Sequence, residues 1–445
     1  MSVQADTHQH LTERYPRGTF LEEDCPDLFD TLHSPIRAAV ARRIFVRAVA
    51  RLPLRIDFPD GTRIGAGGDN DTLMVIHRPH EFFARLGNDA KIGFGEAYMA
   101  GDWDAAPGTD LADLLTPFAA NVATLVPPSL QRLRRLVERR QPASEQATIS
   151  QARRNTSRHY DLSNELFAAF LDESLSYSSA LFKAGDDLAT AQRRKIDTIL
   201  DRAAVRSGST MLEIGTGWGE LAIRAAQRGA HVTTVTLSTE QRDLAMSRVA
   251  SAGLSDQIQI LLADYRDLTG DYDAIVSVEM LEAVGQRYWP EYFSTLDRLL
   301  RPGGHIGLQT ITMPHDRMLA TQHSYTWIHK YIFPGGIIPS IPSIERTLQS
   351  HTSLVATQRL DFGSHYATTL RHWRQRFLTN WATIAGGQFD SVFKRMWEFY
   401  LAYCEAGFAA GYLGVSQFSL SRSGQKSTVL CQTLPTSPRR QSQPA

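Results

Sequence analysis

A glycine-rich loop, LEIGTGWGE, holds the residues whose spacing points most clearly to ligand binding. Gly215, Gly217 and Gly219 form the pattern GxGxG, and such glycines let a backbone turn tightly and approach a ligand closely. A dinucleotide-binding loop instead has the pattern GxGxxG, with an acid about 20 residues further on that holds the ribose. Here Glu220 follows the third glycine, and the next apolar run ends at residues 236–238 without an acid. The loop therefore predicts a bound ligand and disfavours a nicotinamide cofactor.

Polar residues also flank the neighbouring apolar runs, where the ligand of the loop would lie. Glu213 comes just before the glycines, Asp264 and Tyr265 follow the third apolar run, and an acid follows the fourth. S-adenosylmethionine fits this set, because its adenosine needs stacking and edge contacts and its amino acid end needs polar groups. For the loop taken alone, glycines that only ease strand-to-helix packing are the alternative. Four elements in this order favour S-adenosylmethionine.

The elements that would position these residues alternate from about residue 209 onward. Short apolar runs such as STMLEIG, HVTTVTL and YDAIVSV are separated by segments with helical periodicity. This order predicts parallel strands with helical crossovers, which form an α/β doubly wound sheet. Near the end, VSQFSLSRSGQKSTVLCQTL predicts a two-stranded antiparallel hairpin that turns at Ser423 and Gly424. The hairpin favours a seven-stranded, Rossmann-like methyltransferase sheet over a dehydrogenase sheet.

The length of 445 residues exceeds one ordinary core, so two domains are expected. The segment LRIDFPDGTRIGAGG has two short extended runs around a Pro-Asp-Gly turn, which predicts a smaller N-terminal α+β domain. The two ends of the chain are polar, and we expect them to be disordered. The predicted divisions are a disordered N-terminus (1–20), an N-terminal lipid- or membrane-associating domain (21–140), a linker (141–152), an S-adenosylmethionine-dependent methyltransferase domain (153–433) and a disordered tail (434–445).

The composition is ordinary for a globular protein, with 42% hydrophobic and 21% charged residues. No apolar run approaches the roughly 20 residues that span a bilayer, and the N-terminus lacks the apolar core of a secretory signal. Three scattered cysteines allow neither a disulfide framework nor a CxxC metal site. These features predict a cytoplasmic protein without a metal centre.

The formal net charge is zero, but arginines are concentrated in residues 34–55 and 130–158. Both stretches mix arginine with apolar residues, as helices that bind anionic surfaces do, although a solvated helix face is the alternative for each. Phospholipid head groups and nucleic acid phosphates both fit this charge, but the sequence contains none of the common nucleic acid recognition modules. We therefore expect peripheral binding to an anionic membrane surface, the inner membrane face, and no nucleic acid partner.

Several motifs together resemble the cyclopropane-fatty-acyl-phospholipid synthase family over about residues 153–420. They include RHYDLSNELF, LEIGTGWGELAIRAA, IVSVEMLEAVG, YTWIHKYIFPGGIIPS and YLAYCEAGF, in the order of that family. The resemblance implies transfer of the S-adenosylmethionine methyl group to the cis double bond of an acyl chain, usually in a membrane phospholipid. A phospholipid with an unsaturated acyl chain would then be the substrate.

The resemblance also assigns eight residues to the cofactor. Those at its methionine end would be Tyr177, Ser178, Gly215 and Gly217. Those at its ribose and adenine would be Thr236, Leu237, Gln241 and Tyr265. With Glu213 and Asp264, they make up the expected S-adenosylmethionine site.

In that family an acid, a tyrosine, a cysteine and a histidine surround a bound bicarbonate that is thought to act as the base. Glu282 and Tyr400 match the acid and the tyrosine. Ser179 stands at the cysteine and Gln309 at the histidine, and Ala283 replaces a further histidine beside the acid. These departures leave open whether bicarbonate is a second cofactor.

An alkene is a weak nucleophile, so its attack on a methyl group needs close alignment and leaves a carbocation on the acyl chain. Dry surroundings, aromatic faces and a carboxylate stabilise such a cation. Trp327, Tyr331 and Phe333 are the aromatic candidates for this substrate pocket. His159 and Tyr160, in HYDLSNELF, would belong to the cover that excludes water, and a structural hydrogen bond is the alternative for His159.

Placement of the base selects the product, because a proton lost from the new methyl group closes a ring and other routes give a methylene branch. The motifs EAVGxRYWP and CEAGF resemble the actinobacterial relatives that make 10-methylene chains, which a separate flavin-dependent reductase converts to 10-methyl branches. That reductase and a second copy of the chain, in a homodimer, are candidate partners. A cyclopropane product is the first alternative. A methyltransferase for a small molecule or a nucleic acid, and a non-catalytic lipid-binding protein, are the others.

Overall fold

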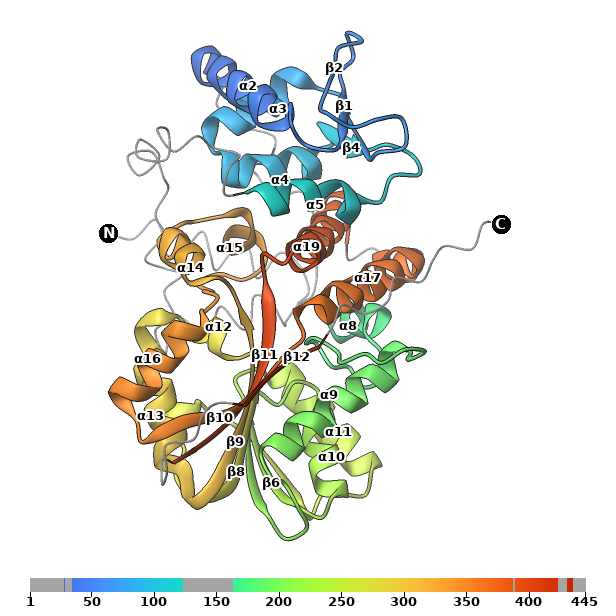
Figure 1. Ribbon diagram of the computed structural model, residues 1–445. Helices are drawn as coiled ribbons and strands as arrows, with labels where there is room; N and C mark the ends of the chain where they lie inside the picture. Colours follow the sequence, from blue (N-terminus) through green and yellow to red (C-terminus); the bar gives the residue numbers. More distant parts are fainter. Residues whose placement is uncertain (1–27, 29–33, 123–162, 387–388, 423–429, 435–445) are drawn as a thin grey trace, which may run out of the picture.

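The computed structural model describes residues 28, 34–122, 163–386, 389–422 and 430–434. Figure 1 shows two parts, a small domain at the top and a large sheet flanked by helices below it. The predicted disordered N-terminus, the predicted linker and all but one residue of the predicted tail lie outside the described residues, as does the whole second basic stretch. Within the described chain no helix is both long enough and apolar enough to cross a membrane.

In the described part of the small domain, a four-stranded sheet in the order β2-β1-β3-β4 packs against four helices. Its elements are α2 (Pro35–Val49), β1 (Arg55–Asp57), β2 (Arg63–Ile64), β3 (Leu73–Ile76), α3 (Pro79–Asn88), α4 (Ala90–Ala100), β4 (Trp103–Ala105) and α5 (Leu111–Asn121). β1 and β2 pair antiparallel around the Pro-Asp-Gly turn. Phe45, Phe82 and Phe83 fill the core, with ring centroids 5.0 to 5.9 Å apart. The predicted smaller α+β domain is confirmed.

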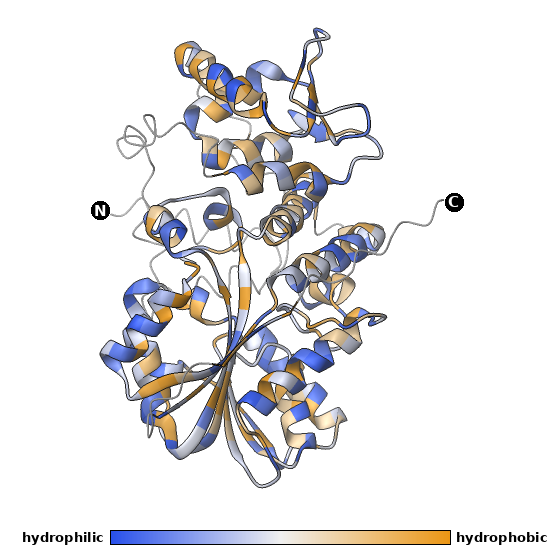
Figure 2. Ribbon diagram, in the orientation of Figure 1, coloured by the Kyte–Doolittle hydropathy of each residue, from blue (hydrophilic) through white to orange (hydrophobic). Residues whose placement is uncertain are grey.

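The large domain is built on a mixed sheet in the order β12-β10-β11-β9-β8-β5-β6-β7. Its strands are β5 (Thr210–Ile214), β6 (His231–Thr236), β7 (Ile258–Leu262), β8 (Tyr272–Val278), β9 (Leu300–Thr312), β10 (Leu354–Asp361), β11 (Gly414–Arg422) and β12 (Leu430–Thr433). β5 to β9 run parallel, and β11 runs antiparallel between β9 and β10. The central strands are mostly buried and hydrophobic (Figure 2), as expected when helices cover both faces. The predicted methyltransferase-type α/β sheet is confirmed.

The predicted terminal hairpin is wrong in its pairing. Both of its strands exist, but β12 pairs in parallel with β10 and does not pair with β11. β11 has no free edge for β12, because β9 and β10 already occupy its two sides. The sheet therefore has eight strands among the described residues, seven in the expected arrangement and one short strand added at the edge.

Helices cover both faces of the large sheet (Figure 1). On one face lie α9 (Leu188–Arg202), α10 (Glu220–Gln227) and α11 (Thr239–Ser251), and on the other lie α13 (Trp289–Leu299) and α16 (Ile341–His351). Between the sheet and the small domain lie α8 (Asn164–Phe170), α12 (Leu281–Val284), α14 (His315–Thr321), α15 (Trp327–Tyr331), α17 (Gly363–Thr379), α18 (Trp381–Ala385) and α19 (Ser391–Ala409). This last layer sits over the carboxyl ends of the parallel strands, where ligands of such sheets bind.

Charged contacts join the small domain to this layer. Arg374 of α17 pairs with Asp110, which caps α5, and with Glu405 of α19. Lys330 of α15 lies 2.6 Å from Glu96 of α4. The hydrophobic core is also continuous across the junction, so α4 and α5 are fixed against α15, α17 and α19.

Candidate active site

The glycine loop joins β5 to α10 at the carboxyl edge of the sheet. Gly215 has φ +99°, and a Cβ there would lie 2.7 Å from the Met280 sulfur, so only glycine fits. Gly217 has φ +51°, and a Cβ there would meet nothing within 4 Å. The Gly215 N–H donates to the Val235 carbonyl at 3.0 Å, which holds the loop against β6. At Gly217 the loop therefore presents its backbone to open space, as a closely approaching ligand requires.

The end of β6 adds polar groups beside this loop. Thr236 Oγ1 donates to Gln241 Oε1 at 2.8 Å, which ties the strand end to α11. The Ser238 side chain caps α11 by accepting from the Gln241 N–H, and Leu237 is half-buried. The structure thus brings together the three residues of this segment that were predicted to contact ribose and adenine.

Glu213 and Asp264 are buried, and both carboxyl groups already have partners. Thr234 Oγ1 donates to Glu213 at 2.7 Å, and burial raises the pKa of Glu213 to about 8. The Arg266 side chain donates to the two oxygens of Asp264 at 2.8 and 2.6 Å. The Tyr265 hydroxyl, in contrast, is inaccessible and has no hydrogen-bond partner among the described residues. A ligand with a polar edge could supply that partner.

Tyr177 and Tyr400 meet although they are far apart in the sequence. Their hydroxyl oxygens lie 2.6 Å apart. The Tyr177 ring stacks on Trp373 with centroids 5.2 Å apart, and Phe333 lies edge-on to Tyr400 at 5.7 Å. Burial holds the pKa of Tyr400 well above its usual value, so this hydroxyl stays protonated. Together these rings form an aromatic wall.

Ser178 contacts a buried lysine that sequence reasoning missed. Lys195 Nζ, on α9, donates to Ser178 Oγ at 2.7 Å. Burial lowers the pKa of Lys195 to about 8, and nearby carboxylates, Glu279 first among them, oppose that shift. A single lysine in an amphipathic helix is usually at the surface, so the sequence carried no signal for this position.

The second half of HYDLSNELF connects the glycine loop to the aromatic wall. Asn164 Oδ1 accepts from Trp218 Nε1 at 2.8 Å, and Trp218 belongs to the glycine loop. Phe167 is buried and packs edge-on against the ring of Tyr177, which is predicted to hold the methionine end of the cofactor. His159 and Tyr160 lie outside the described residues.

Two of the predicted substrate-pocket residues lie at the domain junction. Trp327 Nε1 contacts the Met99 sulfur at 3.3 Å, and the Tyr331 hydroxyl donates to Glu96 at 2.8 Å. Only Phe333, among the described pocket candidates, packs on the aromatic wall. Trp327 does not reach the wall because the small domain covers α15, and its ring packs closely against Gly95 of α4.

Glu282 is held at the strand ends as predicted. Its oxygen Oε1 accepts from the Ile311 N–H of β9, while Oε2 is inaccessible and has no partner among the described residues. Burial and the neighbouring charge of Glu279 raise the pKa of Glu282 to about 8. Its carbonyl accepts from the Ile337 N–H at 2.9 Å, which connects this turn to the loop that carries Phe333.

Ser179 and Gln309 are brought together, but around Glu279. The Ser179 N–H and Gln309 Nε2 donate to Glu279 Oε1 at 2.9 and 2.8 Å. The Tyr366 hydroxyl donates to Glu279 Oε2 at 2.8 Å. Sequence reasoning missed Glu279 and gave Tyr366 no catalytic role. The signal that was available is the position of Glu279, an acid directly after the fourth strand and three residues before Glu282.

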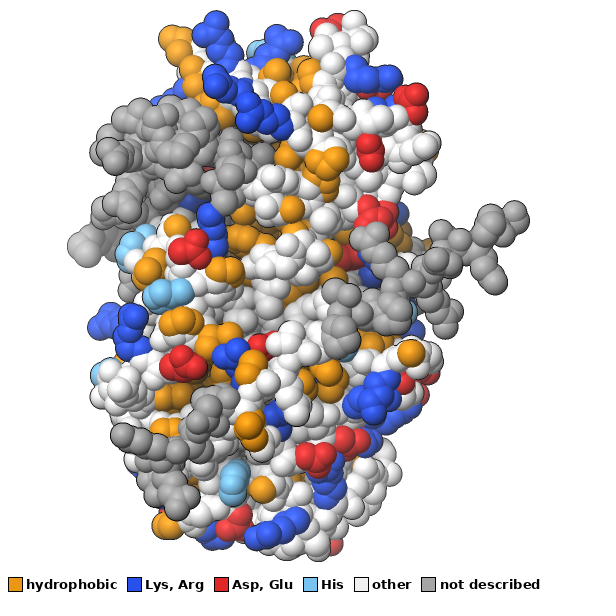
Figure 3. All heavy atoms as spheres, in the orientation of Figure 1, with side chains coloured by type: hydrophobic (Ala, Val, Ile, Leu, Met, Phe, Trp, Pro, Cys, Tyr) orange, Lys and Arg blue, Asp and Glu red, His pale blue; other side chains and the backbone are white. Residues whose placement is uncertain are grey.

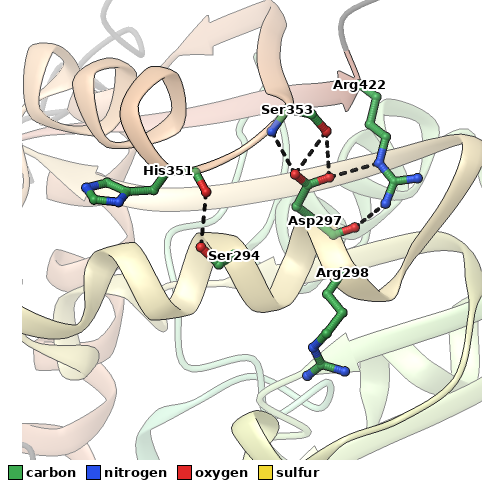
Figure 4. Close-up of a pocket in the computed structure, with 6 residues that line it drawn as sticks. All are labelled: Ser294, Asp297, Arg298, His351, Ser353 and Arg422. Carbon is green, nitrogen blue, oxygen red and sulfur yellow. Dashed lines mark hydrogen bonds and ion pairs between the residues drawn. The ribbon is translucent and has the colours of Figure 1, made fainter.

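A separate surface pocket lies away from these residues. It is lined by Ser294, Asp297, Arg298, His351, Ser353 and Arg422 (Figure 4). Asp297 accepts hydrogen bonds from Ser353 and from Arg422, both at 2.9 Å. These three polar residues of the pocket are therefore hydrogen-bonded to one another. None of the predicted site residues lines this pocket, and we assign the active site to the strand ends.

The comparison with protein families decides the identity of this site. The family described as mycolic acid cyclopropane synthetase matches residues 147–418. The chain belongs to this family. The matched segment contains every site residue described above, from Tyr177 to Tyr400, and leaves out the small domain.

Curated relatives extend the likeness beyond the part that defines the synthetase family. Tuberculostearic acid methyltransferase UfaA1 of Mycobacterium tuberculosis is 52% identical over 395 residues, which cover 87% of this chain and 92% of that protein. The cyclopropane-fatty-acyl-phospholipid synthase of Escherichia coli is 35% identical over 373 residues, which cover 81% of this chain and 90% of that protein. Both matches are longer than the segment 147–418, so they include part of the small domain.

Solved structures of the synthetase family share the fold. The cyclopropane synthase MmaA2 from Mycobacterium tuberculosis has a TM-score of 0.57 and 30% identity, with 61% of this chain and 98% of that chain covered. CmaA1, in a complex with SAH and CTAB, has a TM-score of 0.56 and 30% identity, with 63% and 98% covered. Membership makes this chain an S-adenosylmethionine-dependent methyltransferase with a lipid acyl chain as substrate.

Proposed function

We propose that the chain transfers a one-carbon unit to the cis double bond of an unsaturated phospholipid acyl chain and gives a 10-methylene acyl chain. The observation that carries the proposal is a pair of neighbouring carboxyl groups, Glu279 and Glu282, at the strand ends near an aromatic wall. A carbocation on an acyl chain needs such surroundings. The 52% identity with a tuberculostearic acid methyltransferase supports the 10-methylene product.

S-adenosylmethionine, when bound, supplies an electrophilic methyl group on a sulfonium sulfur. We assign its methionine end to Tyr177, Ser178, Gly215 and Gly217. We assign its adenosine end to Glu213, Thr236, Leu237, Gln241, Asp264 and Tyr265. The open space at Gly217 and the unpartnered Tyr265 hydroxyl support this assignment.

The roles of the remaining residues follow from their contacts. Tyr400 holds Tyr177 by its hydroxyl and offers its ring, with that of Phe333, to the acyl chain. Glu282 is costly to ionise while it is buried, and a positive charge on the substrate offsets that cost. Glu282 therefore stabilises the cation after methyl transfer.

The exposed face of α2 is proposed to meet the membrane surface. Ile36 and Val40 are 78% and 52% exposed, and Arg43 and Arg47 continue the same face one and two turns further along. Figure 3 shows basic and hydrophobic side chains together at the end of the molecule formed by α2. Apolar and basic side chains in this arrangement suit anionic phospholipid head groups.

The activity is tested with radiolabelled S-adenosylmethionine and an unsaturated phospholipid in vesicles. We expect label in the lipid and, by mass spectrometry, a product that takes up hydrogen to give a methyl branch. Unlabelled lipid would contradict the proposal. The 10-methylene product is itself an alkene, so a 10-methyl chain requires a separate reduction, for which a flavin-dependent enzyme is the candidate partner.

Cyclopropanation is the second candidate function. It is favoured by the structural likeness to two cyclopropane synthases and by the 35% identity with the Escherichia coli enzyme. A ring product survives mild hydrogenation, whereas the methylene product does not. The same mass spectrometric experiment therefore separates the two candidates.

Membrane binding is tested by sedimentation with anionic vesicles at low and high salt. We expect the Arg43→Glu, Arg47→Glu double variant to lose binding, because each basic residue near an anionic surface contributes about 1 kcal/mol. Arg346→Glu, an exposed position on α16 far from α2, is the matched control. Equal binding of both variants would place the membrane contact elsewhere.

A further inference from the structure

The backbone of Glu279 has a left-handed conformation, which is unfavourable for a residue with a side chain. It directly follows β8 and has φ +53°, in the left-handed region that favours glycine. Non-glycine residues persist in such conformations where the surrounding structure over-determines them, and these positions cluster at functional sites. Glycine would fit this turn without strain, so the presence of glutamate here points to a role for its side chain.

Three donors converge on the Glu279 carboxylate from distant parts of the chain. Ser179 and Gln309 donate to Oε1, and Tyr366 donates to Oε2. A carboxylate oxygen can accept two hydrogen bonds, so Oε2 keeps one acceptor position open. Ser179 and Gln309 are fully buried, but Glu279 retains accessible surface. Glu279 thus has acceptor capacity that the chain does not use, at a residue that is not fully enclosed at the strand ends.

Ser179 and Gln309 would also be the donors to a small anion such as bicarbonate, if one bound here. A bicarbonate ion in a dry site needs N–H or O–H donors. Gln309 Oε1 accepts from Gln417 Nε2 at 2.9 Å, which fixes the amide so that its own Nε2 faces Glu279. Both residues expected to meet the anion, Ser179 and Gln309, thus donate to a carboxylate that the chain itself provides.

Electrostatics separates the roles of the two carboxyl groups. Burial raises the pKa of Glu279, but its hydrogen bonds to Ser179, Gln309 and Tyr366 and the charge of Lys195 act in the opposite direction. For Glu282, burial and then the charge of Glu279 raise the pKa, and they outweigh its hydrogen bonds to its own N–H, to the Ile311 N–H and to Thr310. Negative charge is therefore better supported on Glu279 than on Glu282.

We propose that Glu279 is a further catalytic residue, the proton acceptor that completes the reaction in place of a bound bicarbonate. The inference rests on the proposed function, because it assumes a carbocation on the acyl chain. Tyr366 is a positioning residue in this scheme, since it acts through Glu279.

The reaction consists of methyl transfer, a hydride shift and loss of a proton. The alkene electron pair forms the new carbon–carbon bond as the carbon–sulfur bond breaks, and the neighbouring acyl carbon is left cationic. A hydride moves to that carbon from the methylated one, which becomes cationic in its turn. A C–H bond of the new methyl group then breaks, its electron pair forms the methylene double bond, and the proton goes to Glu279 Oε2 and later to solvent. Without the hydride shift, the same proton loss closes a cyclopropane ring.

The first test is Glu279→Gln, which keeps the size of the side chain and removes the proton acceptor. We expect lipid methylation to fall at least about a hundredfold while S-adenosylmethionine binding stays within about twofold. The matched control is Glu345→Gln, an exposed acid on α16, which should retain full activity. The unaltered protein should turn over equally fast with and without added bicarbonate in carbonate-depleted buffer.

The second test is Glu279→Gly, which suits φ +53° and so protects the fold if the glutamine variant is unstable. We expect an inactive variant whose methylation is restored by added acetate or bicarbonate, because a free carboxylate can occupy the vacated space. Full activity of either variant, or a bicarbonate requirement in the unaltered protein, would overturn the inference. If the unaltered protein transfers no label to lipid, the proposed function itself fails.

Discussion

Two pairs of partly or fully buried carboxyl groups in this chain have opposite surroundings. The junction carboxylates, Asp110 and Glu405, share the guanidinium of Arg374 at 2.7 and 3.0 Å. The strand-end carboxylates, Glu279 and Glu282, receive hydrogen bonds from backbone N–H, amide and hydroxyl groups. Asp110 and Glu405 are far apart in the sequence, whereas Glu279 and Glu282 are three residues apart, and only the first pair is directly neutralised.

The difference shows how burial can serve either stability or chemistry. A buried charge is tolerated when an opposite charge and good hydrogen bonds compensate its lost hydration. Glu405 has this compensation from two arginines, and its network joins the small domain to α17 and α19. Glu282 lacks it, and its carboxyl group retains a proton to an unusually high pH. Groups with strongly shifted pKa values and no neutralising partner are candidates for reactivity.

The largest expected effect is on turnover in Glu282→Gln. We expect lipid methylation to fall by about 10²-fold or more, because the group that stabilises the cation loses its ability to carry charge. S-adenosylmethionine binding, measured by calorimetry, should remain nearly unchanged. Glu345→Gln, an exposed acid on α16, is the control. Loss of cofactor binding would instead assign Glu282 to the cofactor pocket and remove it from the comparison.

The junction carboxylates should affect stability instead of chemistry. Glu405→Ala leaves Arg371 and Arg374 without their shared buried partner, so we expect a loss of about 3 to 5 kcal/mol in the free energy of unfolding. Urea denaturation measures this loss. Asp243→Asn, in an exposed ion pair with Arg242, should cost less than about 1 kcal/mol. A similar cost for both variants would mean that the junction network contributes no more than a surface pair.

Tyr366→Phe should weaken the site without abolishing it. The variant removes one hydrogen bond to the Glu279 carboxylate, which is worth about 1.5 kcal/mol and corresponds to roughly tenfold slower turnover. A lost donor to the charged form raises the pKa of a carboxyl group. The rising limb of the pH–rate profile should therefore move to higher pH, with KM for the lipid little changed. A lower rate with an unmoved profile would indicate a purely structural role.

The last prediction concerns stability, and a buried acid that belongs to neither pair. The pKa of Glu213 is raised to about 8 from its usual 4.5, so the folded state holds more protons than the unfolded state between these pH values. Stability therefore falls as pH rises through this window. Glu213→Gln removes this dependence, so its stability relative to the unaltered protein should be greater at pH 8 than at pH 5. Thermal unfolding without ligand measures it, and a constant difference would contradict the assignment.

The order of elements along the chain was predictable because it depends on local patterns. Apolar runs and glycine spacing predicted the parallel strands and the loop at Gly215, and the motifs predicted that Glu282 and Tyr400 belong to one site. The position of β12 was not predictable. Alternating polar and apolar residues specify a strand, but they do not specify which neighbour it pairs with.

Sequence alone determined the fold class and the family, since each follows from short stretches of chain, and it predicted a set of residues at the strand ends. Only the tertiary structure decided what these residues touch. It directs Ser179 and Gln309 to Glu279, buries Lys195 beside Ser178, and places Trp327 at the domain junction. The physical reason is that the charge state and partners of a side chain depend on burial and on groups brought from distant segments, and neither quantity is encoded by its sequence neighbours.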